Sequence, residues 1–220
     1  MDVLAEIRAQ LRAAADPTRS AGQQAYMKSA MPFLGVTVPQ ARRLARQVGR
    51  QLDRAEIPSA ATELWDRAEY REERYAAMAL LGLPKVRGDW SVVPVIEHLV
   101  RTGQWWDITD ELAHRLADLH DSQPEPTARL ILEWSGDDDL WIRRIAILSQ
   151  LGRRERTSPA VLAGTITPNV EDPEFFVRKA IGWALREYAK VAPDWVREFV
   201  ASHNLSPLSR REALKHLSRT

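Results

Sequence analysis

The hexapeptide RRIAIL occupies residues 143–148, and related hexapeptides stand at residues 178–183 (RKAIGW) and 73–78 (ERYAAM). The second residue of each is a cation, and these cations are 70 and 35 residues apart. Small and apolar residues follow, as in one buried helix of a repeated unit. A recurring segment at this period is the sequence signature of stacked helical repeats.

The same register can be followed along most of the chain. Its missing position, residue 109, falls inside Trp106-Asp107-Ile108-Thr109-Asp110. Residues 210–214 extend it approximately, and residues 39–44 are a candidate first unit. Helix-forming residues are abundant, and no alternating strand pattern bounded by turn residues is evident. We therefore predict an all-α protein, an α-solenoid that forms one domain over residues 1–220.

Two helix starts can be read directly. Asp172-Pro173-Glu174 has the order of an N-cap, a first-position proline and a first-turn acid. Ser158-Pro159 offers a second start of the same kind. Both patterns follow from the unpaired N–H groups and fixed proline geometry at helix N-termini.

Charge is distributed unevenly along the chain. Residues 140–220 carry 14 basic and 8 acidic side chains, whereas residues 1–139 carry 17 and 22. A basic C-terminal part favours a polyanionic partner such as DNA, because Lys and Arg displace counterions from a phosphate backbone. Repeated cations would then line one groove; the alternative is that they form ion pairs with nearby acids.

Several classes of protein are disfavoured. The chain has no cysteine, and its five histidines do not cluster, so we expect no metal site and no cofactor. No stretch approaches the roughly 20 apolar residues that a membrane span needs. We expect a cytoplasmic monomer that does not bind a membrane.

The tryptophans of residues 105–110 mark a candidate site. Trp106 and Asp110 are four residues apart and share one face of the predicted helix, which begins near Gln104. Successive helical side chains diverge by about 100°, so Trp105 and Trp106 cannot both enter one core. One indole should pack and the other should be displayed; the pattern does not say which.

The predicted helix over residues 174–190 has two distinct faces. Apolar residues at 177, 181, 184, 185 and 188 form a buried stripe. Trp183 lies on another face among Lys179, Arg186 and Lys190. An indole among cations suits contact with sugar and phosphate. The neighbouring Gly182 indicates close approach by a backbone or a ligand.

Arginines gather in two further places. Arg143 and Arg144 lie at the start of a repeat helix, and the loop after Leu151 contains Arg153 and Arg154. Both clusters favour contacts with phosphates, and nothing in the sequence indicates readout of bases.

One carboxylate, aromatic rings and a basic groove suit the cleavage of an N-glycosidic bond. Positive charge develops on the sugar as the base leaves. A carboxylate near the anomeric carbon stabilises that charge and orients water, and indole faces stabilise the same cation. An alkylated, already cationic purine leaves readily, so a single carboxylate would suffice.

The sequence resembles the AlkD-like family of bacterial alkylpurine DNA glycosylases, which are built from HEAT-like helical repeats. The resemblance is collinear over nearly the whole chain, and the rare double tryptophan is part of it. Its matching stretches are Tyr26-Met27-Lys28, Phe33-Leu34-Gly35, Trp105-Trp106-Asp107 with Asp110, Trp141 with residues 144–148, residues 179–183 and 185–190, and residues 207–213.

The resemblance implies that Asp110 is the catalytic carboxylate and that Trp106 and Trp183 flank the deoxyribose of the damaged nucleotide. It implies a DNA-backbone contact for Arg144 and an approach to the duplex by Tyr26. Members of the family do not flip the target base, unlike most glycosylases. One departure is Thr37, which stands where the family pattern has glutamine, so a contact with the base opposite the lesion is in doubt.

We therefore expect a monofunctional glycosylase that removes cationic N3- and N7-alkylpurines from double-stranded DNA in base excision repair. The predicted solenoid would present a concave basic DNA-binding face. One alternative is a self-resistance glycosylase for bulky natural-product adducts, and another is a non-catalytic solenoid that binds DNA or protein. The residues predicted to contact DNA are Tyr26, Thr37, Arg43, Arg143, Arg144, Arg153, Arg154, Lys179, Arg186, Lys190, Arg210 and Arg211.

Overall fold

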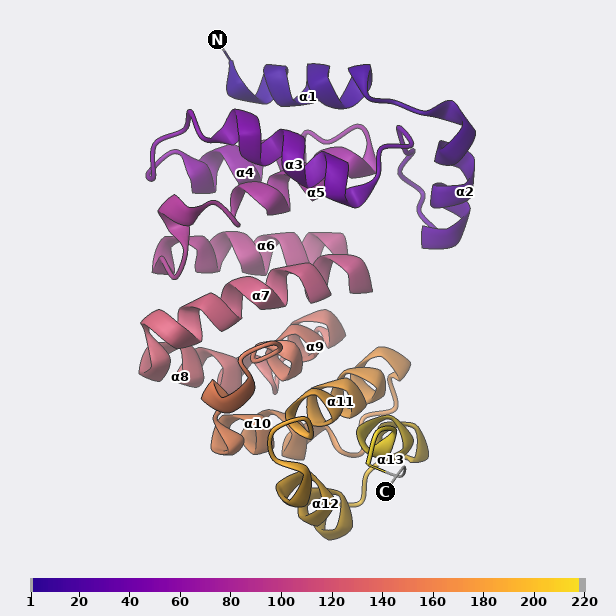
Figure 1. Ribbon diagram of the computed structural model, residues 1–220, viewed down its shortest axis with the longest axis vertical. Coiled ribbons are helices and arrows are strands. Elements are labelled where there is room, and N and C mark those ends of the chain that lie inside the picture. Colours follow the sequence, from indigo (N-terminus) through magenta and orange to yellow (C-terminus); the bar gives the residue numbers. More distant parts are fainter. Residues whose placement is uncertain (1, 218–220) are drawn as a thin grey trace. The chain divides into compact units, whose positions relative to one another are not determined.

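The computed structural model describes residues 2–217, and within them the chain forms α-helices, short 3-10 turns and no strand (Figure 1). The all-helical fold class predicted from the sequence is confirmed. Within the same residues, no helix combines the length and the apolar character that a membrane span requires. The helices are α1 (Val3–Ala13), α2 (Pro17–Met27), α3 (Val38–Gly49), α4 (Ile57–Asp66), α5 (Arg71–Leu80), α6 (Val93–Gly103), α7 (Trp106–Ser122), α8 (Pro124–Trp134), α9 (Leu140–Leu148), α10 (Pro159–Ile166), α11 (Phe175–Tyr188), α12 (Pro193–Ser202) and α13 (Pro207–Leu214).

The chain divides into two compact units. The first ends at Leu99 and the second begins at Val100, so that the boundary falls within α6. Each unit has its own buried apolar residues, among them Ile57 and Leu80 in the first and Ile108 and Ile145 in the second. The single repeat domain predicted from the sequence stays a prediction.

One of the two helix starts that the sequence predicts is confirmed. Ser158 caps α10 by accepting a hydrogen bond from the N–H of Val161, with Pro159 in the first turn. The N-cap predicted at Asp172 is wrong: α11 begins at Phe175, and its N-cap is Glu174. The Asp172 carboxylate instead accepts from the Glu174 N–H at 2.8 Å, closing a turn ahead of the helix.

In the first unit a buried carboxylate fixes the loop that precedes α3. Glu72, fully buried on α5, accepts hydrogen bonds from the backbone N–H groups of Leu34, Gly35 and Val36 at 2.9, 2.9 and 3.1 Å. Gly35 has a φ of +88° and lies so close to the Asp16 carbonyl that a Cβ would be 1.9 Å from its oxygen. Because these contacts hold the loop, they also position the start of α3, which packs against α1 and α5.

The second unit has the arrangement expected of stacked helical repeats. Helix α7 packs on α9, α9 on α11, and α11 on α13, while α8 and α10 form contacts with each other and with α9 (Figure 1). The register positions 109, 144 and 179 lie in α7, α9 and α11. Residues one period apart are therefore brought onto neighbouring helices of one layer.

Helix α11 buries the stripe that its sequence predicts, because residues 177, 181, 184 and 185 are all buried; only Tyr188 remains partly exposed. Gly182 lies where α13 crosses. A Cβ at this position would stand 2.5 Å from the Cβ of Glu212 and 2.9 Å from the carbonyl oxygen of Ser209. Of the two explanations that the sequence left open, close backbone approach is the one observed.

We predict that Gly182→Ala destabilises the fold by about 1–3 kcal/mol, because the added methyl would force α13 away from α11. The matched control is Gly22→Ala in α2, where nothing lies within 4 Å of an added Cβ. There the substitution should stabilise by up to about 1 kcal/mol, the difference in helix propensity. Urea denaturation measures both, and a Gly182→Ala protein as stable as the wild type would contradict the close packing.

Candidate active site

Three helices of the second unit enclose an open hollow of about 420 Å³. Its walls are mainly aromatic, with one carboxylate and three cations among the lining residues. Residues 2–217 contain no group of three or more His, Asp or Glu side chains that could hold a metal ion. The lining residues are Trp106 and Asp110 from α7, Arg144 from α9, and Phe175, Phe176, Lys179, Trp183 and Arg186 from α11.

Asp110 is held by a two-pronged pair with Arg144. The guanidinium donates from Nε to Oδ1 at 3.0 Å and from Nη2 to Oδ2 at 2.9 Å. Its third nitrogen, Nη1, donates to the carbonyl oxygen of Phe176 at 2.6 Å. The Arg144 side chain is 4% exposed and that of Asp110 is 17% exposed. Arg144 is therefore oriented toward the carboxylate, and the open side of Asp110 faces the hollow.

Burial in this aromatic setting raises the pKa of the Asp110 carboxyl above its ordinary value. The charge of Arg144 and its hydrogen bonds act in the opposite direction, as does the Thr109 hydroxyl. A carboxylate has about four lone-pair positions, of which Arg144 takes two and the Thr109 hydroxyl takes a third. The remaining position allows Asp110 to accept a proton or to orient a water molecule.

The two adjacent tryptophans separate into different environments. Trp105, the N-cap residue of α7, lies in an aromatic cluster with ring centroids 6.0 Å from Trp141 and 5.6 Å from Phe176. Trp106 lines the hollow on the same face as Asp110. Both indoles are half-buried, but they face different surroundings, and Trp106 is the one that borders the hollow. The helix begins at Trp106, two residues after the predicted start.

Phe175 and Phe176 were not identified from the sequence, although both line the hollow. Phe176 is part of the aromatic cluster, with its ring centroid 4.9 Å from that of Trp141. Phe175 is 58% exposed, unusual for so large an apolar side chain, and stands at the rim. The available signal was a pair of adjacent phenylalanines directly after a predicted helix start, whose rings point in directions about 100° apart.

Two rim cations are already paired with an acid. Glu212 of α13 contacts Lys179 Nζ at 2.8 Å and Arg186 Nη1 at 2.5 Å. Lys190, further along α11, pairs with Glu187 at 2.6 Å and does not line the hollow. Lys179, Arg186 and Lys190 thus form ion pairs with nearby acids, which is the alternative that the sequence left open to a groove of free cations.

The other predicted DNA contacts of the second unit fall into two groups. Arg143 and Arg153 make internal bonds, to Asp172 and to Asp121, with 3.0 Å between the paired atoms in each case. These two side chains are largely withdrawn from solvent, which indicates a role in joining repeats. The exposed group, none of which lines the hollow, comprises Arg154, Arg210 and Arg211.

The remaining predicted contacts lie in the first unit. Tyr26 of α2 is 76% exposed. Thr37 is the N-cap of α3 and accepts a hydrogen bond from the Gln40 N–H at 3.4 Å, so its side chain has a structural task. Arg43 is exposed on α3.

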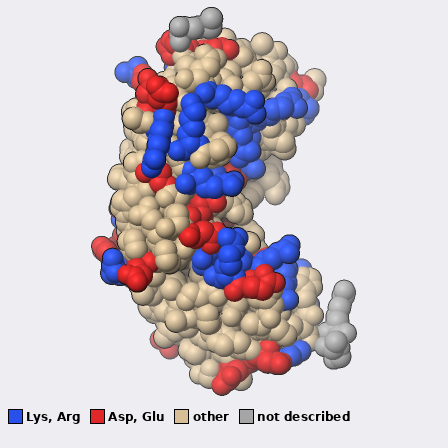
Figure 2. All heavy atoms as spheres, turned by 60° about the vertical axis from the view of Figure 1, so that its left-hand side comes forward, with Lys and Arg blue, Asp and Glu red and all other residues tan. Residues whose placement is uncertain are grey.

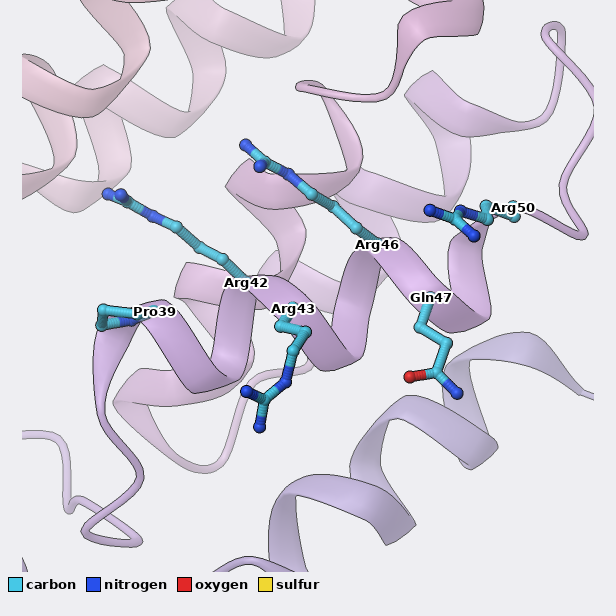
Figure 3. Close-up of a pocket in the computed structure, with 6 residues that line it drawn as sticks. All are labelled: Pro39, Arg42, Arg43, Arg46, Gln47 and Arg50. Atoms are coloured by element: carbon cyan, nitrogen blue, oxygen red, sulfur yellow. The ribbon is translucent and has the colours of Figure 1, made fainter.

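Helix α3 carries a cluster of positive charge that the net charge of residues 1–139 does not indicate. A second hollow on this unit, of about 660 Å³, is lined by Pro39, Arg42, Arg43, Arg46, Gln47 and Arg50 (Figure 3). Arg42 and Arg46 point to one side of the helix and Arg43 to the other (Figure 3). Within residues 2–217, Arg43, Arg46 and Arg50 form no ion pair. We call Arg42, Arg43, Arg46 and Arg50 together the α3 arginine surface.

Like charges four residues apart destabilise a helix by about 0.2–0.5 kcal/mol per pair, and α3 has no acidic residue to offset them. Figure 2 shows Lys and Arg side chains gathered in its upper part, where the first unit lies. In the lower part, basic and acidic side chains lie side by side. The first unit thus offers a cationic surface: residues 1–99 carry 14 basic and 12 acidic side chains, and the acidic net charge of residues 1–139 comes from residues 100–139.

Comparisons with known proteins agree with the fold. The model of a family described as DNA alkylation repair enzyme matches residues 7–217. A solved structure titled a predicted DNA alkylation repair enzyme, from Enterococcus faecalis, is 28% identical, covers 94% of this chain and 98% of its own, and has a TM-score of 0.80. AlkD2 from Streptococcus mutans is 21% identical, covers 84% of this chain and 90% of its own, and has a TM-score of 0.65. No curated protein matches significantly by sequence.

We predict that Arg144→Ala lowers the free energy of unfolding at neutral pH by about 3–5 kcal/mol, because it leaves the largely buried Asp110 without a counter-charge. The exposed Arg154→Ala should change it by no more than about 0.5 kcal/mol. Acidification should shrink the Arg144→Ala loss, because a protonated carboxyl needs no counter-charge. Urea denaturation at two pH values measures both effects, and equal losses for the two variants would refute the buried pair.

Proposed function

The chain belongs to the DNA alkylation repair enzyme family, and from this premise we propose that it is a monofunctional DNA glycosylase. Its substrates would be cationic N3- and N7-alkylpurines in double-stranded DNA, its product an abasic site, and its pathway base excision repair. The observation that carries this proposal is a partly exposed carboxylate, Asp110, set into an aromatic hollow beside cations. That combination matches the charge changes of N-glycosidic bond hydrolysis.

In the proposed reaction the bond between C1′ of deoxyribose and the purine nitrogen breaks, and its electron pair leaves with the base. This neutralises the positive charge of the alkylated purine and creates an oxocarbenium-like sugar. Ionised Asp110 stabilises that sugar and orients a water molecule toward C1′. The proton of the water passes to Asp110 or to solvent as the new C–O bond forms. No cofactor takes part.

The aromatic walls would serve the same cation. Trp106 and Trp183 line the same hollow as Asp110, and their electron-rich faces would attract the positive charge of a sugar bound there. Phe175 and Phe176 extend this surface and exclude water. We propose that the enzyme works from the backbone side without flipping the base, as the resemblance to AlkD-like glycosylases implies.

DNA is the partner that the family implies. We propose that Lys179 and Arg186 contact phosphates beside the lesion and that the α3 arginine surface contacts phosphates elsewhere on the duplex. The exposed residues Tyr26, Arg154, Lys190, Arg210 and Arg211 are further candidates. Thr37, Arg143 and Arg153 are weaker ones, because their side chains already have partners within the protein. We assign Arg144 first to the ion pair with Asp110. A contact between Arg144 and a DNA phosphate would be a secondary role.

A specific observation also favours a second candidate, a DNA-binding protein without chemistry. The pair between Asp110 and Arg144 is what a purely structural ion pair would look like. In that case the carboxylate would hold α7 to α9 and would never meet substrate. The two candidates differ in what happens when Asp110 loses its charge and keeps its shape.

We predict that Asp110→Asn reduces the release of 7-methylguanine from methylated duplex DNA at least about 100-fold, since an amide cannot stabilise the developing cation. Affinity for undamaged duplex should change little. The control is Asp194→Asn on α12, whose side chain is 94% exposed and pairs only locally with Arg197. Single-turnover assays with excess enzyme measure the rate. Equal rates for wild type and Asp110→Asn would favour the second candidate.

The pH dependence of the same reaction provides an independent check. Base release needs ionised Asp110, so the rate should fall as the pH drops through the pKa of this carboxyl. Because burial raises that pKa, the decline should begin at a higher pH than for an ordinary aspartate, whose pKa is about 3.9. The Asp110→Asn variant should lack this limb. A limb shared by both proteins would assign the titration to another group.

For the α3 arginine surface, we predict that Arg46→Ala with Arg50→Ala weakens duplex binding and flattens its salt dependence. The slope of log K against log salt should fall by about 0.9 for each phosphate that the variant no longer neutralises. Arg67→Ala on the first unit removes a cation that is paired with Glu63 at 2.7 Å, and should leave the slope unchanged. Base release at saturating enzyme should be the same in all three proteins. An unchanged slope in the double variant would exclude this surface from the interface.

A further inference from the structure

Glu212 stands between the two cations at the rim of the active-site hollow. Its Oε1 lies 2.8 Å from Lys179 Nζ, and its Oε2 lies 2.5 Å from Arg186 Nη1. Lys179 and Arg186 are seven residues apart on α11, with Trp183 between them, and all three line the hollow. One carboxylate from α13 therefore occupies a position on which two cations converge, which is also the geometry that would bind a phosphate group.

The place of this carboxylate is fixed by backbone packing. Its Cβ lies where α13 crosses α11, so close that a Cβ on Gly182 would be only 2.5 Å away. The Glu212 side chain is 12% exposed, whereas that of Lys179 is 40% exposed. The acid is thus held in place, and the lysine that meets it can turn toward solvent. Surface ion pairs between two mobile side chains contribute little, but here only one partner has to be ordered.

Glu212 carries its charge at neutral pH. Its hydrogen bond with Lys179 holds the pKa of the carboxyl below its ordinary value, and the charges of Lys179 and Arg186 act in the same direction, opposed by desolvation. Lys179, Arg186 and Glu212 together therefore carry a net charge of +1, whereas the two cations alone would carry +2. The α3 arginine surface differs, because Arg43, Arg46 and Arg50 have no acidic partner within the described residues.

We infer that Glu212 is an internal counter-ion that competes with DNA phosphates for Lys179 and Arg186, and thereby limits how strongly the rim of the active site binds any duplex. The inference rests on the proposed function only in taking DNA as the partner. A phosphate that approaches the rim has to displace a carboxylate already bonded to both cations. Fewer counterions are then released on binding, so the rim contributes less salt-dependent affinity than two free cations would. Such a restraint favours release from undamaged DNA and from product.

The test is Glu212→Gln, with binding of an undamaged duplex measured at several salt concentrations. The amide keeps the size of the side chain and removes its charge. We expect the slope of log K against log salt to steepen by about 0.9, the value for one further neutralised phosphate. If affinities are equal at 1 M salt, this slope makes binding about eight-fold tighter at 0.1 M. The control is Glu198→Gln on α12, an exposed acid whose side chain forms no ion pair within residues 2–217 and whose loss changes the net charge equally.

Two further variants separate competition from positioning. In a Lys179→Gln, Arg186→Gln background, Glu212→Gln should no longer steepen the slope, because the contested cations are gone. If Glu212 instead holds the cations in place for phosphate, Glu212→Gln would weaken binding and flatten the slope. A flatter or an unchanged slope for Glu212→Gln would overturn the inference. So would a slope that steepens equally in Glu198→Gln.

Circular dichroism and thermal melting show whether the glutamine variant is folded. Should it not fold, Glu212→Asp keeps the charge but shortens the reach to both cations; a smaller steepening is then expected, and none would overturn the inference. The outcome of this test does not depend on whether the protein is a glycosylase. A steeper slope for Glu212→Gln alongside unchanged base release by Asp110→Asn would retain the counter-ion and reject the glycosylase.

Discussion

Packing between helices that lie one repeat apart is the constraint on which the second unit depends. Helices α7, α9, α11 and α13 form successive contacts, so side chains separated by about one period meet across each boundary. Asp110 meets Arg144 over 34 residues, and the carbonyl of Ser135 meets the Asn169 amide over the same separation. Without this register, the carboxylate of α7, the guanidinium of α9 and the indole of α11 would not share one hollow.

The same stacking explains why most of the repeated cations of the second unit have partners. A cation near a helix–helix boundary loses hydration, and a carboxylate on the next repeat compensates for that loss. Arg144 takes Asp110, Arg143 takes Asp172, and Arg153 takes Asp121. The pairs therefore join neighbouring repeats as well as setting the charge of the surface. Lys179 and Arg186, at the rim of the hollow, follow the same rule, because both pair with Glu212 of α13.

The part of this structure that could be predicted from sequence is the part governed by periodicity. The helical class, the buried stripe of α11 and the shared face of Trp106 and Asp110 follow from spacing alone. The start of α11 was misplaced because Asp172 caps a turn instead of the helix. Phe175 escaped notice because its exposure depends on where that helix begins.

Charge was the least predictable property, since net charge over a long window does not show which cations are paired. Residues 140–220 are rich in arginine, yet several of these side chains are committed to internal acids. The opposite holds on α3, where Arg43, Arg46 and Arg50 lie within residues 1–139, a window whose acidic net charge comes from residues 100–139 alone. Pairing across 30 or more residues is set by the fold, so only the structure separates free from neutralised cations.

The electrostatics of the hollow also bear on which leaving groups it suits. Asp110 is the one carboxylate among the described residues that line it, and Arg144 balances its charge. A second acid that could protonate a departing base is therefore lacking among these lining residues. A neutral purine would have to leave as an anion, which an aromatic wall disfavours. A purine that is already cationic leaves as a neutral molecule, so for the proposed glycosylase the composition of the hollow favours alkylated purines over intact ones.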